Sequence, residues 1–263
     1  INALGLVSTR ASGIKSQFGT MGKPYHAGMA ASNGIEAAKL SKLGFVSRED
    51  GIECDQGFFK THGWDNKTPT RAVENLGTDF LFPEIKYKFH ACCHGLHSFL
   101  EALEELKQEN NFNPESIEEI AIETNPSWLK VCNIQEPKTG LESKFSYKLT
   151  AAMSIYGKDT ADLGTYNDDI CFDEKINNVR DKVTVIPNDK LTNTQSLISI
   201  KDGTREIKNK HDLSDKIDQN ILENKIVNKS VSLLSKNKSH EISKILNSPT
   251  ESKVASLVDC LVS

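Results

Sequence analysis

The sequence of 263 residues predicts an α+β protein, with a mainly helical domain formed from both chain ends and an α+β segment inserted between them. Two changes of pattern predict this arrangement. Apolar residues recur at helical spacing before Phe82-Pro83, alternate as in strands over parts of the next segment, and return to helical spacing after Leu213. We therefore expect helical structure over residues 1–83, an α+β domain over residues 84–210, and helices that return to the helical domain over residues 211–263.

The composition is that of an ordinary globular protein and excludes several classes. Hydrophobic residues make up 37% and charged residues 26% of the chain, and the net charge is -4 without a long basic run. This balance argues against nucleic acid as the main partner. No apolar run approaches the ~20 residues that span a bilayer, so we expect no membrane partner. The six cysteines form no CxxC pair, which indicates free thiols and a cytoplasmic location.

A helix rich in small residues follows the loop that ends at Lys23. Proline fixes φ at the first helical position, so we expect this helix to start at Pro24, with Lys23 just outside it. Gly28 and Gly34 each weaken a helix by up to ~1 kcal/mol, which indicates that another backbone or a ligand lies close to them. The free N–H groups of the first turn, together with Lys23 and His26, would favour an anion. The alternative is a tightly packed core helix whose lysine reaches solvent.

Local patterns predict the other elements in chain order. In the first part these are a helix end over residues 1–10, the stop of the small-residue helix at Gly44, a short helix capped by Ser47, and a short helix over residues 68–76. In the insertion we expect strands over residues 84–89, 116–124, 182–186, 196–201 and 205–207, and helices over residues 92–108 and 142–156. The tail after Leu213 carries apolar residues at helical spacing and is expected to form amphipathic helices.

The segment from Lys88 to His97 holds three histidines and two cysteines. If a helix begins as early as His90, four of these residues lie on one face, namely His90, Cys93, His94 and His97. Zinc binding is one interpretation of this pattern. Four ligands in line along one helix cannot close on one tetrahedral ion, and the sequence has no HExxH motif, so we expect no metal. A metal-dependent enzyme that uses His90 and His94 is a distant alternative.

Three stretches resemble motifs of one enzyme family. In GTMGKPYHAGMAASNGIEAAKLSKLGF, a Gly-Thr, a Lys-Pro-x-His-x-Gly and an Ala-Ala-x-x-Gly follow one another. A Lys-x-x-x-x-Cys-x-x-x-His segment is matched by Lys88, Cys93 and His97, and an Ala-Lys-Phe-Ser segment is similar to the residues from Ser143 to Ser146. On these residues the chain resembles the MmgE/PrpD family, which includes 2-methylcitrate dehydratase, cis-aconitate decarboxylase and iminodisuccinate epimerase.

The resemblance implies a fold and a chemistry. Family members have a helical domain built from both chain ends with a smaller α+β lid between, and they act on small di- and tricarboxylates without a cofactor. It implies Lys23, Lys88 and His26 as catalytic residues. It also implies a polar substrate lining from Cys93, His97, Lys144 and Ser146, although a solvated helix start is an equal interpretation of the last two. Many members have an aromatic residue where this chain has Leu149, so the resemblance does not extend to a substrate contact that depends on an aromatic ring.

Two lysines from two domains suit such substrates physically. Each ammonium group can neutralise a carboxylate and stabilise negative charge that grows in the transition state. Partial desolvation would strengthen both interactions. The positive end of the helix dipole favours the neutral form of His26, which is the expected proton shuttle.

The resemblance also suggests that the chain is part of a longer enzyme. The sequence begins in the phase of an apolar helix, whereas family members carry a helical region ahead of the Lys-Pro motif that contributes an Asp and a His to the site. We expect a homodimer and a lyase or isomerase that dehydrates, decarboxylates or epimerises next to a carboxylate. The alternative is a catalytically silent remnant of the same fold that binds anions.

Overall fold

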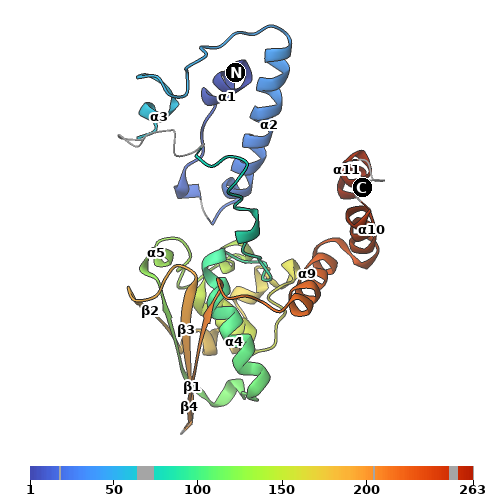
Figure 1. Cartoon of the computed structure of the whole chain (residues 1–263). Coiled ribbons are helices and arrows are strands. Elements are labelled where there is room, and N and C mark those ends of the chain that lie inside the picture. The colour runs from blue at the N-terminus through green and yellow to red at the C-terminus, as the bar shows by residue number, and fades with distance from the viewer. Residues whose placement is uncertain (18, 64–73, 204, 249–253, 263) are drawn as a thin grey trace. The chain divides into compact units, whose positions relative to one another are not determined.

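A computed structural model of the chain describes residues 1–17, 19–63, 74–203, 205–248 and 254–262. The chain divides into two compact units, Ile1–Ile85 and Lys86–Ser263. Figure 1 labels the helices and strands of both. The helices after residue 211 belong to the second unit, and their predicted return to the N-terminal helices stays a prediction.

The first unit is built on two helices that pack against each other, α1 (Asn2–Ser8) and α2 (Gly22–Lys42). An ion pair between Arg10 and Glu36 connects the segment after α1 to α2. The side-chain amide of Asn33 donates to the carbonyl oxygen of Arg10 at 3.4 Å. The shorter helices of this unit are Lys15–Gln17, α3 (Phe58–Thr61) and Phe82–Glu84.

The structure confirms the helix at the chain start and the small-residue helix, with differences in detail. α2 begins at Gly22, so Lys23 lies inside its first turn rather than outside it. Gly44, with φ +89, lies in the left-handed region that ends a helix. No described atom lies within 4 Å of a Cβ placed on Gly28 or Gly34, so this unit alone does not provide the close neighbour that these glycines indicate.

The prediction of a short helix after Ser47 is wrong. The backbone there forms turns, because the Ser47 N–H and hydroxyl both donate to Asn2 of α1 instead of capping a new helix. The N–H donates to Oδ1 of Asn2 at 3.2 Å, and the hydroxyl donates to the Asn2 carbonyl oxygen at 3.1 Å. The helix expected over residues 68–76 lies mostly outside the described residues.

A mixed four-stranded sheet forms the centre of the second unit. Its strands are β1 (Ile117–Thr124), β2 (Val183–Pro187), β3 (Gln195–Asp202) and β4 (Arg205–Asp212), in the order β2-β1-β3-β4. β1 runs parallel to β2 and antiparallel to β3, and β3 is antiparallel to β4. The four strands expected from alternation over these segments are therefore confirmed.

Helices cover the sheet and extend beyond it. They are α4 (His97–Glu109), α5 (Pro126–Leu129), α6 (Gly140–Ser143), α7 (Tyr147–Ile155), α8 (Glu174–Arg180), α9 (Gln219–Leu234), α10 (Lys236–Asn247) and α11 (Val254–Val262). Single-turn 3-10 helices are His94–Leu96, Pro114–Ser116, Leu163–Thr165 and Asp169–Cys171. The amphipathic helices expected in the tail are confirmed, whereas α5 and α8 were not expected.

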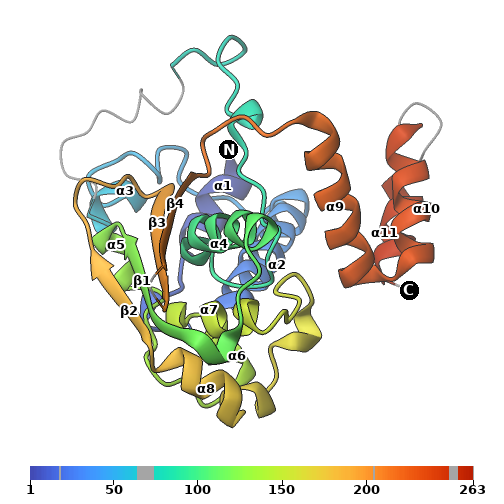
Figure 2. The same ribbon diagram turned by 90° about the horizontal axis from the view of Figure 1, so that it is seen from below.

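The core of the second unit lies between the sheet and two helices. α4 packs against β3 and β4, and α7 packs against β2 and against α4. Figure 2 shows both helices on the same side of the strands. Phe99 and Leu103 of α4 and Ile122 of β1 are fully buried there, and each such side chain contributes roughly 1.5–3 kcal/mol. This core fixes the start of α4, where the candidate site lies.

Three expectations for the insertion are wrong. Residues 84–89 form no strand with the described sheet, because the chain there leaves a 3-10 helix and then binds through Ala91, whose N–H donates to the Thr160 carbonyl oxygen at 2.8 Å. The helix expected from residue 92 begins at His97. The helix expected over residues 142–156 is interrupted, because the Ser146 hydroxyl accepts from the Leu149 N–H at 3.2 Å and starts α7 afresh.

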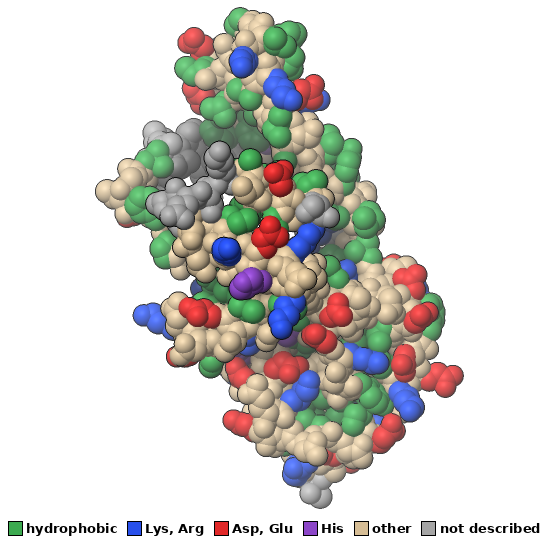
Figure 3. Space-filling model, turned by 90° about the vertical axis from the view of Figure 1, so that its right-hand side faces the viewer, with side chains coloured by type: hydrophobic (Ala, Val, Ile, Leu, Met, Phe, Trp, Pro, Cys, Tyr) green, Lys and Arg blue, Asp and Glu red, His purple; other side chains and the backbone are tan. Residues whose placement is uncertain are grey.

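One face of the molecule carries charged side chains of both signs (Figure 3). On the face drawn in Figure 3, acidic and basic side chains are interspersed. Among the described residues no helix has both the length and the apolar content needed to cross a membrane.

Candidate functional site

The loop that leads into α4 carries two predicted site residues, Lys88 and Cys93, and a third, His97, begins the helix. The N–H of Cys93 donates to the carbonyl oxygen of Lys144 at 2.9 Å, which joins this loop to the segment between α6 and α7. The Tyr147 hydroxyl donates to the Gly95 carbonyl oxygen at 2.7 Å. A Cβ on Gly95 would lie 2.5 Å from the ring of Trp128, so only glycine allows the loop to pass this close. The loop is therefore held from two sides.

His97 is fully buried, and the backbone uses both of its ring nitrogens. Its Nδ1 donates to the carbonyl oxygen of Cys93 at 3.1 Å, since a carbonyl can only accept. Its Nε2 accepts from the N–H of His90 at 3.3 Å. Burial, followed by the charges of His90 and Lys88, lowers the pKa of His97 to about 2. His97 is thus a neutral ring in one tautomer, and contact with a ligand would require one of these bonds to break.

His94 is less buried than His97 and its ring is less constrained by hydrogen bonds. It is half-buried, with its ring centre 5.4 Å from that of His97 and 6.2 Å from that of Trp128. Among the described residues neither of its ring nitrogens has a hydrogen-bond partner. Burial and then the positive charge of Lys88 lower its pKa. Both effects disfavour the charged form of the His94 ring, and its unbonded nitrogens make it a candidate for proton transfer.

Lys88 is exposed, and its ammonium group is close enough to affect several neighbours. It lowers the pKa of His94 and of His97, and it opposes the rise that burial causes in the pKa of Cys92, which reaches about 12. Lys144, on the segment bonded to Cys93, is half-exposed with Nζ 5.7 Å from the ring centre of Tyr166. Lys88, Cys93 and His97 thus lie on one short segment, and the backbone of Lys144 is bonded to it.

Ser146 lies beside this group but has a structural task. It is fully buried and caps α7 through its hydroxyl. Its predicted contact with substrate stays a prediction.

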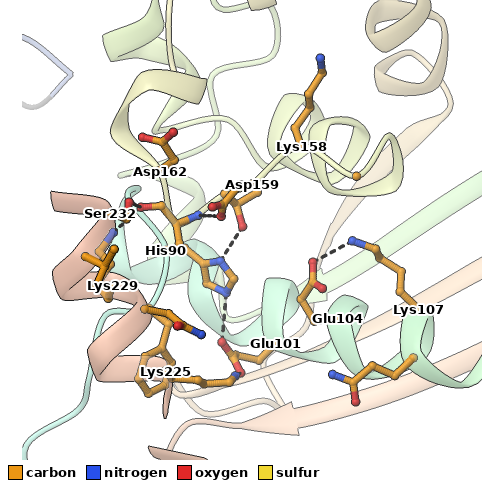
Figure 4. Close-up of a pocket in the computed structure, with 17 residues that line it drawn as sticks. His90, Glu101, Glu104, Lys107, Lys158, Asp159, Asp162, Lys225, Lys229 and Ser232 are labelled. Carbon is orange, nitrogen blue, oxygen red and sulfur yellow. Dashed lines mark hydrogen bonds and ion pairs between the residues drawn. The ribbon is translucent and has the colours of Figure 1, made fainter. Parts of the chain in front are cut away.

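A pocket of about 720 Å³ lies on another side of the same loop (Figure 4). At its base, Nδ1 of His90 lies 2.6 Å from the Thr160 hydroxyl, and Nε2 of His90 lies 3.0 Å from Oε1 of Glu101. Lys225 of α9 forms an ion pair with the other carboxylate oxygen of Glu101. We call Lys225, Glu101, His90 and Thr160 the His90 network. Sequence reasoning considered His90 only as a metal ligand and missed the other three, which come from three separate segments.

With this geometry described, comparison with known families decides the relationship. Residues 90–247, more than half of the chain, match the model of the MmgE/PrpD C-terminal domain. The chain belongs to the MmgE/PrpD family. The matched range includes Cys93, His94, His97, Lys144 and Ser146, and begins two residues after Lys88.

Two relatives that match part of this chain are fungal proteins. The chain is 32% identical over 114 residues to the cis-aconitate decarboxylase-like protein oryM of Aspergillus oryzae, and 32% identical over 114 residues to cis-aconitate decarboxylase of Aspergillus terreus. Each match covers 41% of this chain, and 24% and 23% of the respective relatives. The matched segment therefore spans about a quarter of the length of these relatives.

The first unit of this MmgE/PrpD chain carries the two remaining predicted residues. Lys23 is half-buried in the first turn of α2, and His26 lies one turn further along. His26 lines a largely apolar pocket of about 470 Å³, and a Cβ on Gly13 would lie 3.2 Å from its ring. That Lys23 and Lys88 bind one substrate stays a prediction.

The premise of the metal alternative is wrong for this family member. Because α4 begins at His97, His90 and Cys93 precede the helix and do not share a helix face with His94 and His97. Among the described residues, no three His, Cys, Asp or Glu side chains converge as metal ligands.

Proposed function

We propose that this chain is part of a lyase or isomerase that acts on a small di- or tricarboxylate next to one of its carboxylate groups. The observation that carries the proposal is that residues 90–247 match the MmgE/PrpD C-terminal domain, with His94 in this range packed against His97 and Trp128, and Lys88 near enough for its charge to lower the pKa of His94. The names of the fungal relatives favour decarboxylation and cis-aconitate as the first substrate to test.

In the proposed reaction Lys88 binds a substrate carboxylate. A charge-assisted hydrogen bond of this kind contributes roughly 1.5–3 kcal/mol. When carbon dioxide or a proton leaves the substrate, negative charge grows on the carbon and its remaining carboxylates, and a nearby ammonium group stabilises it. Lys88 then stabilises the transition state more than it stabilises the bound substrate.

His94 is proposed as the group that moves the proton. A neutral imidazole can take a proton from a carbon next to a carboxylate, and the imidazolium so formed can return it at another carbon or face. Lys23 and His26 are proposed, as the family resemblance implies, as a second cation and a second proton carrier.

The test uses a full-length enzyme and the variants Lys88→Met, Lys23→Met and His94→Phe, with Lys158→Met as the control at an exposed lysine. Turnover of cis-aconitate and of a panel of di- and tricarboxylates is measured, and folding is checked by circular dichroism. We expect Lys88→Met to lower kcat/KM about tenfold or more. Wild-type turnover in both lysine variants would place the site elsewhere, and binding without turnover in the parent would favour the silent anion-binding alternative.

A further inference from the structure

The His90 network is built from buried polar groups that the proposed reaction does not use. His90, Glu101 and Thr160 are each no more than 6% exposed. They come from the loop before α4, from α4 itself and from the loop after α7. Figure 4 shows His90 and Glu101 facing one another at the pocket. Lys225 adds α9 as a fourth segment. Buried polar groups are costly unless they are fully bonded, so such a network holds its members in one arrangement.

The hydrogen positions in this network follow from its partners. A carboxylate can only accept, so Nε2 of His90 carries a hydrogen and donates to Glu101. The Thr160 hydroxyl binds the opposite ring nitrogen, which fixes the imidazole plane of His90. The loop backbone is held at the same residues, because the N–H of Ala91 donates to the Thr160 carbonyl oxygen.

The network reaches the candidate site through one further bond. The backbone N–H of the anchored His90 donates to Nε2 of His97, and Nδ1 of His97 donates to the carbonyl oxygen of Cys93. Cys93 directly precedes His94, whose ring lies against that of His97. A continuous chain of hydrogen bonds and one ring contact therefore runs from Lys225 of α9 to His94.

We propose that Thr160 and Glu101 are positioning residues, which act through His90 and His97 to hold His94 and Lys88 in their working geometry. Lys225 forms an ion pair with Glu101, so the helix α9 contributes to the geometry of His94 and Lys88 through this network. The catalytic part of this inference rests on the proposed function, whereas the positioning part is measurable without turnover. A small displacement of a proton-transfer group lowers kcat, while carboxylate binding at Lys88 and therefore KM change little.

The experiment compares two matched pairs in the full chain. Thr160→Val removes the hydroxyl at nearly constant volume, and Thr160→Ser restores it. Lys225→Met removes the lysine that pairs with Glu101, whereas Lys107→Met removes the lysine that pairs with Glu104 of the same helix and lines the same pocket. Long-range proton–nitrogen spectra report the Nε2 signal of His97, and hydrogen exchange reports the amide of His90.

We expect Thr160→Val and Lys225→Met to move the His97 Nε2 signal toward that of a nitrogen without a hydrogen bond, and to speed His90 amide exchange. Their kcat should fall about tenfold with KM nearly unchanged, and Thr160→Ser and Lys107→Met should resemble the parent. Unchanged spectra in both Thr160→Val and Lys225→Met would overturn the inference, as would equal effects from Lys107→Met. Spectra that move as expected in an enzyme that turns over no carboxylate would support the network and count against the proposed function alone.

Discussion

Replacing Glu101 by glutamine removes one buried negative charge without changing the size of the side chain. In the parent, burial raises the pKa of the Glu101 carboxyl, but the bonds from His90 and Lys225 outweigh burial and lower that pKa from 4.5 to about 2. At 1.36 kcal/mol per pKa unit this difference corresponds to about 3 kcal/mol of folding free energy at neutral pH. Lys225 is 35% exposed, so solvent weakens its contribution, and the bond from the buried His90 contributes more to the lowered pKa.

The sign of the pH dependence follows from the direction of the shift. A carboxyl whose pKa is lower in the folded state stabilises the protein above its unfolded pKa, and that stability is lost as the pH falls toward the folded pKa. We expect Glu101→Gln to cost about 2–3 kcal/mol at pH 7, and the difference from the parent to shrink between pH 4.5 and about 2. Glutamine does not titrate and the other carboxyl groups are the same in both proteins, so the difference between them reports the titration of Glu101.

Urea unfolding of both proteins at several pH values, followed by circular dichroism, measures this difference. Glu104→Gln is the matched control, because Glu104 is 37% exposed and pairs with the partly exposed Lys107. Exposed pairs are worth roughly 0–1 kcal/mol, so this control should change little. A Glu101→Gln cost that is independent of pH, or no larger than that of Glu104→Gln, would refute the reasoning.

Four further predictions concern packing at two glycines, thiol reactivity and metal content. Gly140→Ala should lower stability by roughly 3 kcal/mol or more, measured by thermal unfolding, because its Cβ would lie 2.2 Å from the Tyr166 carbonyl oxygen. Gly28→Ala should raise stability by up to ~1 kcal/mol, and a loss in the full-length enzyme would instead indicate a close neighbour. Iodoacetamide at pH 8 should label the half-buried Cys54 before Cys92, whose pKa is raised to about 12 by burial, and mass spectrometry gives the order. Elemental analysis should find less than one metal ion per chain, and a chelator should leave turnover unchanged.

The sequence by itself determined the features that depend on neighbouring residues. Alternation over residues 116–124 was sufficient to predict β1, and helical spacing in the tail was sufficient to predict α9 and α10. Both patterns repeat within one element. Gly44 was sufficient for the end of α2, since a left-handed residue favours glycine. The motif residues Lys88, Cys93 and His97 led to the family that the match over residues 90–247 then established.

Only the tertiary structure decided where α4 begins and what its histidines do. The N–H of Cys93 donates to the carbonyl oxygen of Lys144, so the chain stays extended until the 3-10 turn before His97. Local helix propensity does not indicate this bond. Burial lowers the pKa of both His97 and His94, and burial depends on packing across the whole unit. Thr160 and Lys225 show the same limit, because no local pattern connects either of them to His90 until the fold places them together.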